Sequence, residues 1–220
     1  MEIISKIFFF IGSLVCHQMP ERTICIDGMY LPLCARDTGI YLGVTIVFIY
    51  SFVRGKIKSD KVPSTQISII LALLTVPMMI DAVSSYISIR QTDNTVRLMT
   101  GIFFGMPIVL FLVPTANYKA YDTNKIKIID SYYDLLLLSF INICIGIIIL
   151  KFSVLKWWMV AIASLFGLVF IITRVGYTIM KLLNIGSPKG RVIYALALTT
   201  MFFGCLFILK YYVIEWLRLL

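Results

Sequence analysis

Long apolar stretches separated by short polar loops run along the whole chain. A helix needs about 20 mostly apolar residues to cross a bilayer, because it rises only about 1.5 Å per residue. Seven stretches come near or reach that length, and the pattern predicts a membrane-spanning helix for each, at residues 3–18, 38–54, 65–88, 96–116, 133–151, 156–180 and 191–213. The sequence therefore predicts an all-α polytopic membrane helix bundle of about seven transmembrane helices.

The composition supports this class. Hydrophobic residues make up 60% of the 220 positions and charged residues 14%, whereas soluble domains have about 45–50% and about 25%. The mean hydropathy is +0.95. Such a chain cannot cover its surface with polar groups, which excludes a soluble domain, a disordered chain and a secreted disulfide scaffold. We expect a single integral-membrane domain over residues 1–220, in the cell membrane, with the lipid bilayer as its first partner.

The basic residues predict the orientation. The chain has 20 Lys and Arg against 11 Asp and Glu. Loops rich in Lys and Arg lie on the cytoplasmic side of membrane proteins. Three alternate loops are basic, and they hold Arg54, Lys56, Lys58 and Lys61; Lys119, Lys125 and Lys127; and Lys181, Lys189 and Arg191. We therefore expect the N-terminus in the cytoplasm and the C-terminus outside. The same rule accounts for the positive charge without a nucleic-acid partner.

The first apolar stretch has a second interpretation, as a cleaved signal peptide. Glu2 accompanies the single basic residue Lys6, and no small-residue cleavage site follows. Bulky Val15 before Cys16 also makes a poor lipidation site. These features favour an uncleaved helix.

The predicted outer loop between the first two spans is chemically unusual. It holds three of the five cysteines, and the chain's only histidine, His17. The string C-H-Q-x-P-x-R at Cys16–Arg22 is followed by P-x-C-x-R-D-T-G-I-Y-x-G at Pro32–Gly43. This signature resembles a family of small prokaryotic integral-membrane proteins known only as a domain of unknown function. A looser block holds Asp81, Asn94, Arg97, Thr100 and Gly101.

The resemblance covers residues 10–107, and the helices at about 133–213 carry no motif of this kind. It implies a multi-pass fold and a shared site, but no activity. The family has Cys or Asp where Asp37 stands in this chain, which suits a metal-ligand position.

The loop has the residue types of a zinc site. Cys34 and Asp37 are one helical turn apart, and Cys16 and His17 come from the end of the first span. Thiolate, imidazole and carboxylate are zinc ligands, so Cys16, His17, Cys34 and Asp37 form a candidate metal set, with zinc as the candidate cofactor. Three alternative interpretations stay open: Asp37 and Thr38 only cap the second span, Cys16 and Cys34 form a disulfide, or the thiols are free packing residues.

Two predicted spans begin alike. One reads Arg36-Asp37-Thr38-Gly39 with Gly43, and the other Arg97 followed by Thr100, Gly101 and Gly105. Glycines four residues apart let helices approach closely, so two positive helix ends and their arginines are expected to meet at the outer face. We expect an anion site with Arg36 and Arg97, and with Gln18, Arg22, Thr38, Asn94 and Thr100 as further ligand contacts. The alternative is pure packing, with the arginines reaching to headgroups.

Asp81 is an acid inside the third span. A carboxylate at that depth costs a few kcal/mol unless it is paired or faces water. Arg36, Arg97 or the metal is its expected partner, and a structural ion pair is the alternative to a catalytic role.

Together these features indicate a zinc-type membrane enzyme that acts on an anionic lipid-linked or amphipathic substrate. In this hypothesis Asp81 is the general base, and Arg36 and Arg97 hold the anionic group. The alternatives are a small transporter or solute-binding subunit with an anion pocket, and a structural or assembly partner whose outer loop is only cross-linked for stability. The sequence does not indicate an oligomeric state.

Overall fold

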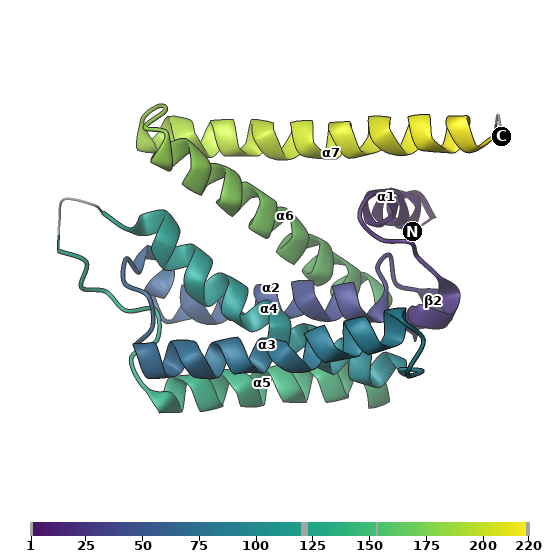
Figure 1. The fold of residues 1–220 in the computed structure, drawn as a ribbon, viewed down its shortest axis with the longest axis horizontal. Coiled ribbons are helices and arrows are strands. Elements are labelled where there is room, and N and C mark those ends of the chain that lie inside the picture. The colour runs from purple at the N-terminus through teal and green to yellow at the C-terminus, as the bar shows by residue number, and fades with distance from the viewer. Residues whose placement is uncertain (1, 120–122, 153, 219–220) are drawn as a thin grey trace.

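The computed structural model describes residues 2–119, 123–152 and 154–218, and it is a bundle of helices (Figure 1). The α-helices are α1 (Glu2–Ser13), α2 (Ala35–Val53), α3 (Thr65–Tyr86), α4 (Asn94–Asn117), α5 (Tyr132–Lys151), α6 (Trp157–Leu182) and α7 (Pro188–Arg218). Two 3-10 turns, η1 (Pro20–Arg22) and η2 (Lys56–Lys58), and a two-stranded antiparallel hairpin, β1 (Cys25–Ile26) with β2 (Met29–Tyr30), lie in the connections.

The all-α polytopic class is confirmed. Within the described residues, six helices, α2 to α7, are long and apolar enough to cross a membrane. Their bounds agree with the predicted spans to within five residues at each end. The core between them holds Val44, Leu71, Met106, Leu110 and Leu138, all with 0% exposure.

The first predicted span, residues 3–18, is wrong as a membrane crossing. Helix α1 has 12 residues, which at 1.5 Å per residue give about 18 Å, short of the roughly 30 Å hydrocarbon core. The chain turns back after Ser13, because the side-chain amide of Gln18 donates to the carbonyl oxygens of Phe9 and Pro32 at 2.8 Å each. The polar residues after Val15 therefore end the helix early.

Helix α1 lies across one end of the bundle. Figure 1 shows it almost end-on, while α3, α5 and α7 run across the view. The rings of Phe8 and Phe9 stack on Trp157 with centroids 6.0 and 6.2 Å away, and the Lys210 ammonium donates to Ser13 O at 2.8 Å. An apolar helix held this way has the placement of an interfacial helix.

Both ends of the chain consequently lie at the same end of the bundle (Figure 1). Six crossings return the chain to the side on which it began, whereas the predicted inner N-terminus and outer C-terminus require a seventh; the sides of the two ends stay a prediction. We call this end, with residues 14–34, the cysteine face. The opposite end, with residues 54–64, 118–119, 123–131 and 183–187, is the lysine face, and its cytoplasmic orientation stays a prediction.

Helices α2 and α4 run parallel with their backbones in contact. A Cβ added to Gly39 would lie 2.3 Å from Leu98 O, and one added to Gly105 would lie 2.0 Å from Ile40 O. Gly43 and Gly101 meet the opposite backbone as closely, at 2.3 and 2.4 Å. The glycine spacing in the two similar segments thus places the first turns of both helices side by side at the cysteine face.

We expect Gly105→Ala to destabilise the bundle by about 1–3 kcal/mol or more, because the new methyl group must push α4 away from Ile40 O. Gly204→Ala in α7 is the matched control, since an added Cβ there meets nothing within 4 Å, and alanine favours a helix by up to about 1 kcal/mol. Thermal unfolding in detergent measures both. A Gly105→Ala variant as stable as the parent protein would contradict the backbone contact.

Candidate functional site

The segment between α1 and α2 folds back on itself at the cysteine face. Gln18 adopts a left-handed backbone conformation with φ of 52°, and its side chain joins α1 to the end of the segment as described above. A Cβ on Gly12 would lie 2.0 Å from Pro32 O, so the two ends of the segment touch. This closure brings Cys16 next to Cys34. It also commits both amide hydrogens of Gln18 to the backbone, so the predicted ligand contact by this residue does not fit its position.

Three of the four predicted metal ligands come together. The ligand atoms of Cys16, Cys34 and Asp37 all lie within 4.8 Å of one another. The backbone N–H of Cys34 donates to Cys16 Sγ at 3.2 Å, and the Cys34 thiol donates to Asp37 Oδ2 at 3.2 Å. Within the described chain the cysteines are free thiols. This cluster is called the thiol–acid cluster below.

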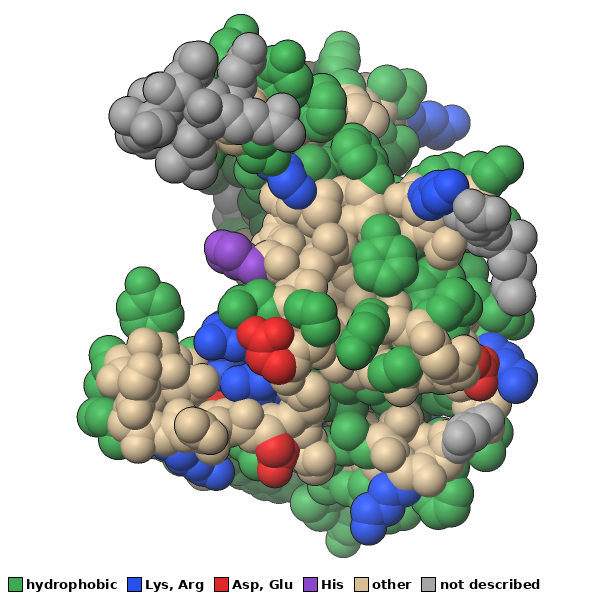
Figure 2. Space-filling model, turned by 90° about the vertical axis from the view of Figure 1, so that its right-hand side faces the viewer, with side chains coloured by type: hydrophobic (Ala, Val, Ile, Leu, Met, Phe, Trp, Pro, Cys, Tyr) green, Lys and Arg blue, Asp and Glu red, His purple; other side chains and the backbone are tan. Residues whose placement is uncertain are grey.

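His17 lies outside the thiol–acid cluster. Its side chain is exposed, and it stands at the surface of the cysteine face as the single histidine in Figure 2. Adjacent residues on a turning backbone point in different directions, which separates His17 from Cys16. The structure therefore brings together three of the four candidate ligands.

The start of α2 differs from the expected cap. Cys34, not Asp37 or Thr38, occupies the N-cap position, and Asp37 stands in the first turn. The Thr38 hydroxyl is fully buried and donates to Leu33 O at 3.2 Å. The Thr100 hydroxyl donates to Val96 O at 2.7 Å within its own helix. Both hydroxyls thus donate to backbone carbonyl oxygens, and neither lines the pocket described below.

The two thiols of the cluster differ in acidity. Hydrogen bonding from Cys34 holds the pKa of the Cys16 thiol below its usual range, although burial acts in the opposite direction. The pKa of Cys34 is raised, first by the hydrogen bond with Cys16 and then by burial and the negative charge of Asp37. Cys16 therefore loses its proton first, and the thiolate is the form that binds metals or attacks electrophiles.

Arg36 and Asp81 form a buried ion pair between α2 and α3. Arg36 Nη2 lies 2.5 Å from Asp81 Oδ2, and the Asp81 side chain is 3% exposed. Arg36 was one of the expected partners. Two further atoms of the pair, Asp81 Oδ1 and Arg36 Nε, are buried without a hydrogen-bond partner among the described residues. The hydrogen-bonding capacity of the pair is therefore only partly used.

Arg97 is buried without a carboxylate. It is 8% exposed, and its Nη1 donates to Asn94 Oδ1 at 3.1 Å. Asn94 in turn donates to the carbonyl oxygens of Glu21 and Thr23, at 3.3 Å each, so it orients Arg97 and joins α4 to the outer segment. No acid in the described parts of the chain forms an ion pair with Arg97.

Positive charge therefore accumulates at the cysteine face. Arg97 lies within electrostatic range of Arg22, Arg36, Asp81 and Cys34. Three guanidinium groups share this region, and Asp81 balances one of them. Figure 2 shows Lys and Arg side chains gathered with acidic ones beside a hollow of this face.

A pocket of about 350 Å³ opens beside these groups. It is lined by Arg22, Arg36, Ala82, Val83, Ser85, Tyr86 and Ile87. The sequence predicted both arginines but not the α3 residues. Their signal was the Ser84-Ser85-Tyr86 run that follows Asp81 by about one turn. An anionic group in this pocket would meet two guanidinium groups.

We expect Asp81→Asn to lower the free energy of unfolding by roughly 3–5 kcal/mol, because it leaves Arg36 as an unpaired, half-buried cation. Adding Arg36→Met should recover a substantial part of this loss. Asp27→Asn is the control, because Asp27 pairs with Lys156 at 3.8 Å in an exposed ion pair and should change stability by less than about 1 kcal/mol. Chemical denaturation in detergent gives the double-mutant cycle. Additive effects of the two substitutions would contradict the pairing.

Comparisons with known proteins agree with the membrane class. Residues 16–111 match a family model described as a predicted membrane protein (DUF2085). An uncharacterized protein of Methanocaldococcus jannaschii is 36% identical over 114 residues, which are 51% of this chain and 70% of that protein. An uncharacterized protein of Methanothermobacter thermautotrophicus is 37% identical over 97 residues, 44% of this chain and 82% of that protein. No solved structure matches the chain significantly. The matched residues contain the thiol–acid cluster, Asp81 and all three arginines, and the chain belongs to the DUF2085 family of multi-pass integral-membrane proteins.

Proposed function

We propose that this protein is a membrane enzyme that binds an anionic, amphipathic substrate at the cysteine face, next to a zinc-type metal ion held by the thiol–acid cluster. The observation that carries the proposal is Arg97. Arg97 is 8% exposed, and no acid of the described residues forms an ion pair with it, so its guanidinium would be stabilised if an anion shared its site. Phosphate and carboxylate match the planar fork of arginine.

The donor set fits a catalytic zinc-type ion. Cys16, Cys34 and Asp37 supply two thiolates and a carboxylate within 4.8 Å, and catalytic zinc sites use three protein ligands and leave a fourth position open. The lowered pKa of Cys16 favours the ligand form of one thiol. Such an ion supplies a Lewis acid and lowers the pKa of a bound water.

The chain's own residues have distinct roles in this proposal. Arg22 and Arg36 line the pocket and bind the anionic group. Arg97 does not line the pocket but adds positive charge near it. Asn94 is a positioning residue for Arg97. Asp81 orients Arg36 through Oδ2 and offers its unpartnered Oδ1 as a proton acceptor.

The surroundings of the pocket favour an amphipathic substrate. Val83, Tyr86 and Ile87 line it and are 60%, 89% and 55% exposed. They extend the apolar outer side of α3, which faces the lipid in a six-span bundle. A substrate with an acyl or prenyl tail could lie along this side while its charged group meets the arginines.

We expect the purified protein to bind about one equivalent of zinc, and Cys34→Ser or Asp37→Ala to weaken zinc binding roughly tenfold or more. Cys25→Ser and His17→Ala are the matched controls. Cys25 is an exposed thiol and His17 an exposed imidazole on the same face, so both variants should keep the metal. Elemental analysis after dialysis against zinc gives the ratio. Equal zinc in Cys34→Ser and the parent protein would refute the metal site.

We expect Arg97→Met to keep or raise the melting temperature without added anion, because it removes a buried charge that nothing balances. The parent protein should gain about 2.7 kcal/mol of stability with inorganic pyrophosphate at a hundred times its dissociation constant, and Arg97→Met should lose most of this gain. Arg90→Met, at an exposed arginine of the same face, should keep it. A drop in melting temperature without anion, together with an unchanged gain, would show a purely structural Arg97. Anion binding in protein that binds no zinc would instead favour the transporter or solute-binding alternative.

A further inference from the structure

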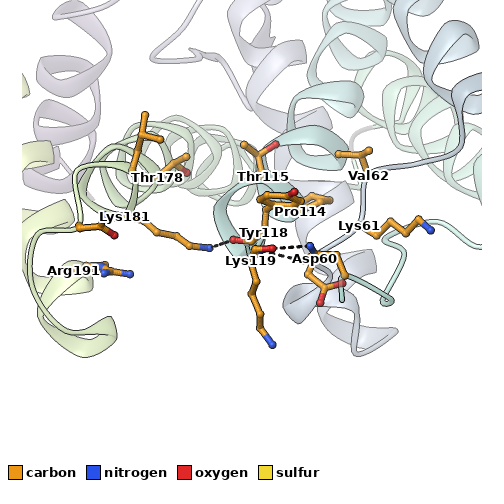
Figure 3. Close-up of a pocket in the computed structure, with 13 residues that line it drawn as sticks. Asp60, Lys61, Val62, Pro114, Thr115, Tyr118, Lys119, Thr178, Lys181 and Arg191 are labelled. Carbon is orange, nitrogen blue, oxygen red and sulfur yellow. Dashed lines mark hydrogen bonds between the residues drawn. The ribbon is translucent and has the colours of Figure 1, made fainter. Parts of the chain in front are cut away.

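A second cavity, of about 860 Å³, lies at the lysine face (Figure 3). Its walls come from the connection between α2 and α3, from the end of α4 and the loop after it, and from the end of α6, the turn that follows and the start of α7. It is at the opposite end of the bundle from the thiol–acid cluster, so it belongs to no part of the proposed enzyme site.

The cavity carries an excess of positive charge. Lys61, Lys181 and Arg191 line it, and Asp60 is the acid among the lining residues. Asp60 is 8% exposed, and its Oδ1 accepts a hydrogen bond from Ile126 N–H at 2.8 Å, which joins two loops. No ion pair links these three cations to an acid within the described ranges. The charge is therefore available to a ligand.

Two of the cations are held in place with donors to spare. Lys181 Nζ donates to Ala116 O at 2.9 Å and also to Tyr118 O, and an ammonium has a third hydrogen. Arg191 Nε donates to Ile185 O at 3.1 Å, which leaves both terminal nitrogens for a bidentate acceptor. Figure 3 shows Lys181 extending toward the end of α4, with Arg191 on the neighbouring helix.

The wall formed by α4 is anchored from both sides. Asn117 Nδ2 donates to Ile57 O at 2.7 Å and to Ser59 O at 2.9 Å. Arg174 Nη2 of α6 donates to Asn117 Oδ1 at 2.8 Å. One side chain thus ties α4 to α6 and to the α2–α3 connection beside the cavity.

Apolar groups complete the cavity and point to the kind of ligand. Val62, Pro114 and Leu182 line it, and Leu182 is 81% exposed. Ile179 and Leu183, on either side of Leu182, are 46% and 59% exposed. Charged donors above an apolar, outward-facing helix end suit a molecule with an anionic headgroup and hydrocarbon chains better than a free inorganic anion.

We propose that this cavity binds the phosphate headgroup of an anionic phospholipid through Lys181 and Arg191, with the lipid chains along the outer side of α6 and α7. Basic pockets between helix ends are suited to anionic headgroups. The proposal does not depend on the enzyme proposed above.

Native mass spectrometry of the detergent-solubilised full chain, mixed with equal amounts of phosphatidylglycerol and phosphatidylcholine, tests this inference. We expect phosphatidylglycerol adducts to exceed phosphatidylcholine adducts at least fivefold. Arg191→Gln should lower this ratio by roughly fivefold, the factor expected from one basic residue near an anionic surface. Lys58→Gln is the matched control: it removes one exposed charge of the same face outside the cavity and should leave the ratio unchanged.

A second arm separates the lipid from free phosphate. Inorganic phosphate at millimolar concentration should neither form a retained adduct nor displace phosphatidylglycerol. Equal retention of the two lipids, an unchanged ratio in Arg191→Gln, or displacement by phosphate alone would each overturn the proposal. Arg191→Lys keeps the charge and should retain most of the preference, which guards against a loss caused by misfolding.

Discussion

The direct backbone contact between α2 and α4 is the constraint on which the rest of the structure depends. Four glycines let the two helices pack without side chains between them, and parallel packing places Arg36 and Arg97 in the first turns of adjacent helices. Gly167 of α6 approaches the same helix pair, since its Cβ would lie 2.1 Å from Tyr41 O. A larger residue at any of these positions would separate the charged groups and widen the core.

Close packing at this point also creates an electrostatic problem. It gathers the guanidinium groups of Arg22, Arg36 and Arg97 at one end of the bundle, where Asp81 balances one of them. Selection for stability alone would replace a buried, unpaired cation with an apolar residue, since such substitutions are often neutral or stabilising. The proposed anionic ligand would balance the buried Arg97, and this is the physical link between the fold and the proposed function.

Sequence patterns predicted the structural features that depend on neighbouring residues along one helix. The apolar stretches gave six spans, the glycine spacing indicated the α2–α4 contact, and the depth of Asp81 required a partner such as Arg36. The pattern failed where geometry depends on how a loop turns. Polar residues after Val15 end α1 early. The turn at Gln18 leaves the imidazole of His17 away from the thiol of Cys16. The sequence indicated the basic loops of the lysine face but not the cavity, because its lining comes from separate parts of the chain that only the fold brings together.

The length of helix α4 explains why the two proposed sites would take different molecules. Its 24 residues span about 36 Å, with Arg97 near its beginning and Pro114 near its end. Glycine contacts with α2 hold the first half of α4. Hydrogen bonds from Asn117 to Ser59 O and from Lys181 to Ala116 O hold its last turn. No single headgroup can reach both ends of such a helix, whereas two amphiphiles, one at each membrane surface, can occupy them at the same time. A lipid at the lysine face would then stabilise the end of the same helix that presents Arg97 to the substrate at the cysteine face.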